Sequence, residues 1–268
     1  MINFSVTIII TTFNRDQYLK DCLDSILKQS YKYFKIIIVS DGDFESTTSL
    51  INSYNNEKIQ LISNVHTGIP SVSRNIGIMK SYSDLICFCD DDDIWESNKL
   101  FEQVQIFNKN PNCLVYTNIF TINSNNIEIT QKNNLLIDTY NYVLKKNNFF
   151  LFFKNYICLS SIMITTDLAK RNLFNESIEY RGSEDYLFLL NYLSYKNPIF
   201  YLKEKLVGYR IHESNLSSNT LNGYSRSIKI LDKKAKDFKL NKYPIILIAK
   251  FFYHLKYIIK SYKVMFTK

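Results

Sequence analysis

The chain has 268 residues, of which 46% are hydrophobic and 22% are charged, with a formal net charge of +8 at pH 7. This hydrophobic content excludes a disordered protein, which would be less apolar. The length suits one large domain or a domain with an appendage. The five cysteines include no repeated pair with zinc-site spacing, which argues against a disulfide framework and a structural zinc site.

The positive charge is concentrated at the C-terminal end. Residues 226–268 contain twelve Lys or Arg and two Asp, a net charge of +10, which leaves about −2 for residues 1–225. Such a segment binds anionic partners, either nucleic acid or an acidic membrane surface. Within it, residues 244–266 are apolar and aromatic but contain four lysines, which is too many for a membrane-spanning helix. This leaves an amphipathic helix in the membrane interface, or a helix that packs on the rest of the protein.

Strands and helices are expected to alternate through the first 110 residues. This alternation is typical of a Rossmann-like, mostly parallel sheet flanked by helices, an α/β fold. The expected strands cover residues 4–10, 34–39, 59–62 and 84–89, and the expected helices cover 15–29, 45–54, 71–82 and 97–108. The second half is less regular, with strands expected over 113–122, 157–167 and 199–211 and a helix over 183–196.

An acidic run follows one of the most apolar expected strands. Residues 90–93 are four adjacent aspartates, which repel one another unless a cation or several hydrogen-bond donors compensate them. The run is therefore either a divalent-metal site or an acidic loop in solvent. Two further polar clusters, at 11–15 and 40–42, follow other expected strands. Because parallel sheets bind ligands at the carboxyl ends of their strands, the three clusters together favour the metal site.

These clusters belong to an ordered set of motifs that resembles the family 2 glycosyltransferases, which have the GT-A fold. The resemblance covers roughly residues 4–215. The matching segments are residues 6–15, 22–30, 37–42, 73–77, 88–95, 182–188 and 209–212. The family often has Asp where this chain has Ser40, and Tyr where it has Phe13. The Gln-x-x-Arg-Trp motif of processive members is absent from the sequence, which favours a non-processive enzyme.

The resemblance implies a role for each of eleven residues. The nucleotide site would be formed by Thr11, Phe13, Arg15, Asp41, Arg74, Asp90 and Asp91. In this site Asp41 would accept the imide hydrogen of uracil, and Arg74 would face the diphosphate. Asp92 would bind Mn²⁺ or Mg²⁺, and His212 would reach the metal or the diphosphate. Asp185 would be the catalytic base, with Glu184 beside it in the acceptor site.

Three of these residues have a purely structural alternative. Arg74 would then form an ion pair, Asp185 would stabilise a helix start, and His212 would be a polar residue beside Arg210. The chemistry nevertheless suits the residue types. A hard cation held by carboxylate oxygen stabilises a departing diphosphate, and a carboxylate base accepts the proton of an attacking hydroxyl.

The sequence and the resemblance together predict an inverting, metal-dependent glycosyltransferase that uses a UDP-sugar. Its acceptor would be a saccharide or a polyprenyl-linked saccharide in bacterial surface-polysaccharide synthesis, and nucleic acid is not expected as a partner. One alternative is a sugar nucleotidyltransferase, although residues 11–15 lack the glycine-rich loop of that class. Another is a non-catalytic nucleotide-binding module, although the presence of both Asp92 and Asp185 argues against it.

The expected organisation is a GT-A catalytic domain over residues 1–220 and a basic amphipathic helical tail over 221–268. The nucleotide-binding half of the domain would cover about 1–110, and the acceptor half about 111–220. Because the sequence shows no recognisable secretion leader, we expect a cytoplasmic protein, peripheral on the inner face of the membrane.

Overall fold

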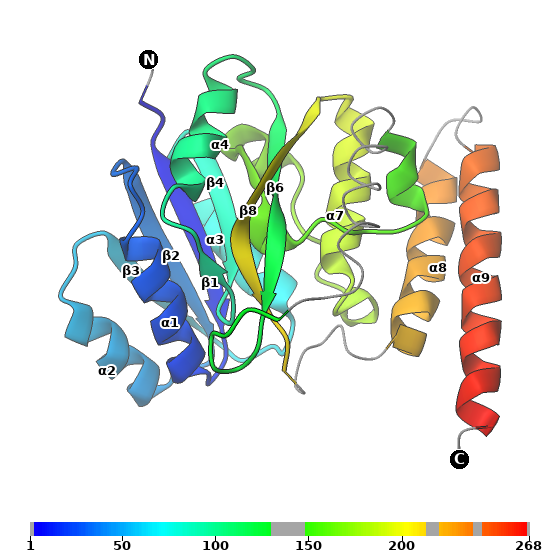
Figure 1. Ribbon diagram of the computed structural model, residues 1–268, viewed down its shortest axis with the longest axis horizontal. Coiled ribbons are helices and arrows are strands. Elements are labelled where there is room, and N and C mark those ends of the chain that lie inside the picture. The colour runs from blue at the N-terminus through cyan, green and yellow to red at the C-terminus, as the bar shows by residue number, and fades with distance from the viewer. Residues whose placement is uncertain (1–2, 130–147, 213–219, 238–242, 267–268) are drawn as a thin grey trace.

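The computed structural model describes residues 3–129, 148–212, 220–237 and 243–266, and its centre is a mixed, eight-stranded sheet with helices packed around it (Figure 1). The strands are β1 (Val6–Thr12), β2 (Phe34–Asp41), β3 (Ile59–Asn64), β4 (Leu85–Asp90), β5 (Ile94–Trp95), β6 (Leu114–Ile122), β7 (Met163–Thr165) and β8 (Ile199–Arg210). The α-helices are α1 (Asp16–Leu27), α2 (Glu45–Tyr54), α3 (Pro70–Lys80), α4 (Lys99–Phe107), α6 (Thr166–Arg171), α7 (Glu184–Tyr192), α8 (Thr220–Asp237) and α9 (Tyr243–Phe266). Short 3₁₀ helices are η1 (Asn148–Phe152), η2 (Leu159–Ser161), η3 (Ile178–Tyr180) and η4 (Leu193–Tyr195).

The strand order is β3-β2-β1-β4-β7-β6-β8-β5, and β1 to β4 are parallel to one another. The isoleucines and valines of β1, β2 and β4 are buried on both faces, as helix-covered parallel strands require, whereas those of the edge strand β3 are partly exposed. In the register of the sheet, Thr11 lies opposite Asp90 and Thr12 opposite Ser40. The polar clusters that follow β1, β2 and β4 therefore lie at one edge, as the sequence predicts.

The strand predicted over residues 157–167 is wrong for most of its length. Only β7 forms a strand in this range, because η2 precedes it and α6 begins directly after it. The Ser161 hydroxyl stabilises the 3₁₀ turn, since its Oγ donates to the carbonyl of Cys158 at 2.6 Å. Thr165 then caps α6 by accepting the backbone N–H of Leu168.

The two-residue strand β5, which the sequence does not predict, pairs antiparallel with β8 and places Ile94 opposite Gly208. A Cβ on Gly208 would lie 2.7 Å from the Ile94 side chain, so the strands approach closely only because this residue is glycine. This pairing joins the end of the acidic run to the second half of the chain.

Helices α8 and α9 lie side by side at one end of the molecule (Figure 1). Ile230 and Leu231 of α8 and Ile246, Ala249 and Tyr253 of α9 are buried in the same cluster as the side chains of α7. The inner face of the C-terminal segment thus packs on the rest of the protein, which was one of the two alternatives from the sequence. Within the described residues, every helix is too short or too polar to cross a membrane.

Candidate active site

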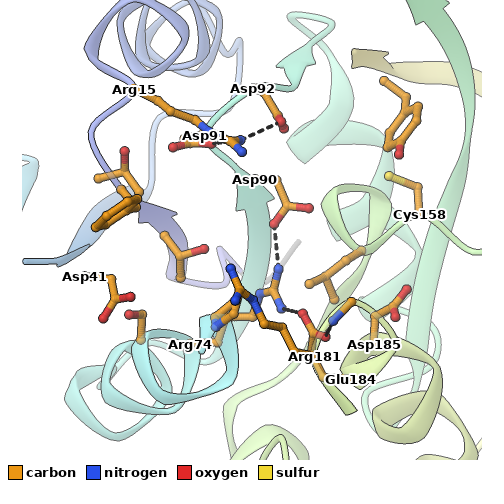
Figure 2. Close-up of a pocket in the computed structure, with 18 of the residues that line it drawn as sticks. Arg15, Asp41, Arg74, Asp90, Asp91, Asp92, Cys158, Arg181, Glu184 and Asp185 are labelled. Carbon is orange, nitrogen blue, oxygen red and sulfur yellow. Dashed lines mark hydrogen bonds and ion pairs between the residues drawn. The ribbon is translucent and has the colours of Figure 1, made fainter. Parts of the chain in front are cut away.

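A cavity of about 510 Å³ lies at the carboxyl ends of β1, β2 and β4, which is the size of a typical small-molecule site (Figure 2). Ten of the eleven residues predicted from the sequence line it. They are Thr11, Phe13, Arg15, Asp41, Arg74, Asp90, Asp91, Asp92, Glu184 and Asp185. The eleventh, His212, is not a lining residue but contacts one, since its Nε2 is 2.9 Å from Asp92 Oδ2. The sheet thus brings together the predicted donor and acceptor residues.

One wall of the cavity is built around Asp41, at the end of β2. Its Oδ1 accepts the Thr67 backbone N–H at 2.8 Å, and its Oδ2 accepts the Gly68 N–H at 2.8 Å. The half-exposed Phe13 ring stacks on His66, with ring centroids 4.4 Å apart. The wall thus presents a fixed carboxylate beside aromatic rings. Sequence analysis missed His66 because it belongs to none of the motifs, although it follows a strand that ends at this edge.

A second wall is formed by the middle of the acidic run. Arg15 Nη1 lies 3.3 Å from Asp91 Oδ1 and 2.9 Å from Asp92 Oδ2. Burial and the adjacent Asp92 carboxylate raise the pKa of Asp91 to about 7, although Arg15 opposes this. His212 stacks on the ring of Tyr18 at 5.2 Å, which fixes the imidazole against Asp92. The Arg15 guanidinium therefore compensates the charge of these two carboxylates, and the imidazole of His212 adds a polar contact to Asp92.

The last aspartate of the run is structural. Asp93 is fully buried, and its carboxylate accepts the Ser160 hydroxyl at 2.5 Å and the Arg210 backbone N–H at 3.1 Å. Burial and the neighbouring carboxylates raise its pKa well above the ordinary value. Asp93 thus fixes the run against β8 and lies outside the cavity lining.

The residues at Asp92 fit a divalent cation whose coordination is completed by a substrate. Carboxylate oxygen is the ligand type that Mg²⁺ and Mn²⁺ prefer, and His212 adds an imidazole nitrogen. Among the described residues, no three His, Cys, Asp or Glu side chains converge on one point, so the protein alone would supply few ligands. This suits a Mg²⁺-type site, which usually combines one or two carboxylates with substrate phosphates.

Arg74 on α3 is held between two carboxylates, with Nη2 2.8 Å from Asp90 Oδ1 and Nη1 2.7 Å from Glu184 Oε1 (Figure 2). Burial lowers the pKa of Arg74, but Asp90 and Glu184 raise it by more, so the guanidinium stays charged. The ion-pair alternative for Arg74 therefore holds, although the pair is buried rather than on the surface. The bridge joins the acidic run to the first turn of α7.

Asp185 lies next to Glu184 at the start of α7 and lines the cavity. Its Oδ2 accepts a hydrogen bond from Asn155 Nδ2 at 3.0 Å, and Asn155 Oδ1 accepts the Ile157 backbone N–H at 3.0 Å. The second contact fixes the orientation of the amide. Burial and the neighbouring Glu184 raise the pKa of Asp185 to about 6, which suits a proton acceptor near neutral pH. Sequence analysis missed Asn155, which lies in the irregular region without a motif.

Arg181, in the turn before α7, was also missed. Its side chain is exposed and directed into the cavity (Figure 2). The guanidinium of Arg181 lies beside Gly68, where a Cβ placed on the glycine would be 4.0 Å from Nη1. It therefore reaches the loop whose backbone N–H groups bind Asp41. Within the described part of the chain the guanidinium forms no ion pair, unlike those of Arg15 and Arg74. It is therefore a positive charge available to an anionic ligand.

A model of the family described as glycosyl transferase family 2 matches residues 7–168, more than half of the chain, and the chain belongs to this family. It is therefore a glycosyltransferase with the GT-A fold, as its motifs predict. One relative is the Escherichia coli UDP-Glc:alpha-D-GlcNAc-diphosphoundecaprenol beta-1,3-glucosyltransferase WfgD. The two chains are 26% identical over 268 residues, which cover 98% of this chain and 96% of WfgD.

Solved structures show the same fold. Residues 1–349 of TarS from S. aureus, in complex with UDP-GlcNAc, superpose with a TM-score of 0.74 at 18% identity, over 94% of this chain and 73% of that one. The mannosyltransferase PcManGT from Pyrobaculum calidifontis, in complex with GDP-Man and Mn²⁺, gives a TM-score of 0.71 at 13% identity. That match covers 95% of this chain and 71% of the mannosyltransferase.

Proposed function

We propose that this glycosyltransferase transfers a sugar from a UDP-sugar to a hydroxyl group of a lipid-linked saccharide, with inversion at the anomeric carbon. The observation that carries the proposal is the position of Asp185. This carboxylate, with a pKa of about 6, shares one cavity with the Asp41 wall and with the carboxylates of Asp91 and Asp92. One site can therefore hold a nucleotide and also deprotonate a second substrate.

The donor would bind along the ends of β1, β2 and β4. Asp41 Oδ1 accepts both the backbone N–H and the hydroxyl of Thr67, and Oδ2 accepts the Gly68 N–H. His66 Nδ1 lies 3.1 Å from Oδ2 but 2.9 Å from the Asp41 carbonyl oxygen, to which it can donate instead, so one of the about four acceptor sites of the ionised carboxylate is left for a ligand. Asp41 can therefore accept the imide N–H of uracil, while Phe13 and His66 offer flat rings beside the base. The UDP-sugar named for WfgD supports uracil as the base.

The diphosphate would lie between the acidic run and Arg181. Asp92 and His212 would hold Mn²⁺ or Mg²⁺, and Asp91 would face the nucleoside. The bound cation would stabilise the charge that develops on the departing diphosphate. Arg181 would add a bidentate positive group from the other side. Arg74, which both carboxylates engage, would position Asp90 and Glu184 and also contribute its charge to the site.

Asp185 would act on the acceptor. It accepts the proton of the attacking hydroxyl as that oxygen bonds to the anomeric carbon, and the bond from this carbon to the diphosphate oxygen breaks on the opposite face. UDP leaves with the bonding electron pair, so the configuration inverts. A carboxylate in this role contributes typically ~10²–10⁴-fold in rate. Asn155 would position the Asp185 carboxylate through its hydrogen bond.

We further propose that the acceptor lies in a membrane and that the product is part of a bacterial surface polysaccharide. WfgD is named for a diphosphoundecaprenol-linked acceptor, and its similarity extends over 98% of this chain, beyond the residues that the family model matches. The enzyme would act at the cytoplasmic face of the membrane, where the hydrocarbon chain anchors the acceptor and the saccharide remains in water.

The test is release of UDP from a panel of UDP-sugars, with and without a synthetic GlcNAc-diphospholipid, in the presence of Mn²⁺ or Mg²⁺. We expect release that requires both the acceptor and the metal, with the sugar recovered on the lipid. A nucleotidyltransferase would instead form pyrophosphate from UTP and a sugar phosphate, and a binding module would release nothing. Either outcome would overturn the proposal.

A further inference from the structure

The outward side of α9 is apolar along most of the helix. Seven large side chains there are each 43–65% exposed, and they are Leu247, Ile248, Phe251, Phe252, Leu255, Ile258 and Ile259. We call them the outer α9 face. The opposite side of the helix holds the buried residues Ile246, Ala249 and Tyr253. A contiguous apolar surface of this extent is uncommon on a monomeric protein and indicates an interaction site.

We infer that the outer α9 face lies in the interface of an anionic lipid bilayer, an inference that rests on the proposed lipid-linked acceptor. Interfacial helices bury an apolar face about 5–10 Å into the boundary between headgroups and acyl chains. Their lysines extend to the anionic headgroups. Helix α9 fits this arrangement, since its sequence contains four lysines and no acidic residue.

The charges of α9 also argue against pairing with a second copy of the chain. Two copies joined through this face would bring together helices that each carry four lysines and no carboxylate of their own to compensate them. Only Lys250 has a described acidic partner, Asp232 of α8, while Lys260 is exposed. An anionic lipid surface supplies the missing negative charge.

The position of α9 relative to the cavity supports the inference. Helix α9 runs in the same direction as β1, so its C-terminal half lies toward the end of the sheet where the cavity opens (Figure 1). Phe252 of the outer face packs edge-on against Phe153, with ring centroids 5.9 Å apart. Two residues further on, Asn155 contacts Asp185. The face is thus linked by a short segment to the proposed acceptor side, which a membrane-embedded acceptor would require.

The test is co-sedimentation of the full chain with vesicles of phosphatidylcholine alone and of phosphatidylcholine with phosphatidylglycerol. The variant carries Phe251→Ser and Ile258→Ser, both on the outer face. Its matched control carries Met79→Ser and Ile127→Ser, which replace two similarly exposed apolar residues elsewhere. We expect the wild type and the control to bind the anionic vesicles, and the variant to bind roughly tenfold more weakly or worse.

A second measurement separates membrane binding from catalysis. With a short-chain, water-soluble acceptor the variant should match the control, whereas with the acceptor embedded in vesicles it should be slower. Equal vesicle binding by variant and control, or no binding by the wild type, would overturn the inference. So would a wild-type dimer that the variant abolishes, because the face would then be covered by a second copy. The vesicle experiment contains no nucleotide, so its result stands even if the proposed transfer reaction fails.

Discussion

Arg74 and Glu184 form a buried ion pair, with 2.7 Å between Nη1 and Oε1, although 110 positions separate them in the sequence. The pair joins α3, beside the proposed donor site, to the first turn of α7, which carries the proposed base. Glu184 Oε2 also accepts the Ser183 backbone N–H at 3.0 Å, so the carboxylate is held on both sides. This ion pair thus connects the donor side of the cavity to its acceptor side.

Replacing Arg74 should cost stability. In Arg74→Ala the carboxylates of Asp90 and Glu184 lose their shared cation, and breaking a buried pair in this way costs about 3–5 kcal/mol. Urea denaturation of the variant and the wild type at neutral pH measures the difference. Adding Glu184→Gln should recover part of the loss, since the uncompensated charge is removed. A loss below about 1 kcal/mol in Arg74→Ala would contradict this account of the bridge.

The pH dependence of sugar transfer should follow the ionisation of the Asp185 carboxylate. The base must be ionised to accept a proton, and its pKa is raised to about 6 by burial and by Glu184. We therefore expect kcat/KM to fall as the pH decreases through about 6, by tenfold per pH unit well below it. A profile that stays flat down to about pH 4, near the ordinary pKa of aspartate, would exclude this carboxylate as the base.

The raised pKa of Asp185 also predicts how the free energy of unfolding depends on pH. Ionisation of Asp185 should lower this free energy, whereas ionisation of a typical aspartate raises it. The folded protein favours protonated Asp185, so its ionisation destabilises the fold above pH 6, and this cost disappears below the ordinary aspartate pKa. Asp185→Asn should therefore be more stable than the wild type at about pH 8, by up to about 3 kcal/mol, and similar to it near pH 3. Thermal unfolding at both pH values measures this, and a pH-independent difference would argue against the raised pKa.

Asn155 should act through Asp185. Its amide stabilises the ionised carboxylate, so Asn155→Ala should raise the pKa of Asp185 further and move the acidic limb of the pH profile upward. We also expect a lower kcat with little change in the KM for the donor. Asn52→Ala, an exposed position on α2, is the matched control. A purely structural role would lower activity equally at all pH values.

Arg181 should contribute to the binding affinity for UDP but not to that for uridine. The Arg181→Ala variant should lose roughly tenfold or more in affinity for UDP, and its affinity for uridine should stay unchanged, because only UDP carries the diphosphate. Calorimetry with both ligands measures the difference, with Arg171→Ala on the surface as control. A change in acceptor KM with unaltered UDP binding would assign Arg181 to the acceptor instead.

The sequence predicts those residues of the site whose positions are determined by the topology of the sheet. Asp41 and Asp90 end buried strands, and parallel pairing brings such ends together whatever the loops do. His66, Asn155 and Arg181 could not be predicted in this way, because they lie in irregular segments whose conformation depends on contacts distant in the sequence. The partners of Arg74 were missed for the same reason. The expected strand over 157–167 was wrong because the apolar pattern of this segment does not show that the Ser161 hydroxyl will bond to the carbonyl of Cys158 and stabilise a 3₁₀ turn.

The most direct test of the central claim is a comparison of the wild type with Asp185→Asn, using a UDP-sugar, the lipid-linked acceptor and the metal. The variant keeps the shape of the side chain and the donor wall, so it should bind UDP as the wild type does. Its acceptor-dependent release of UDP should fall by about 10²-fold or more. If the variant releases UDP at the wild-type rate, Asp185 is not the base, and the proposed mechanism is contradicted.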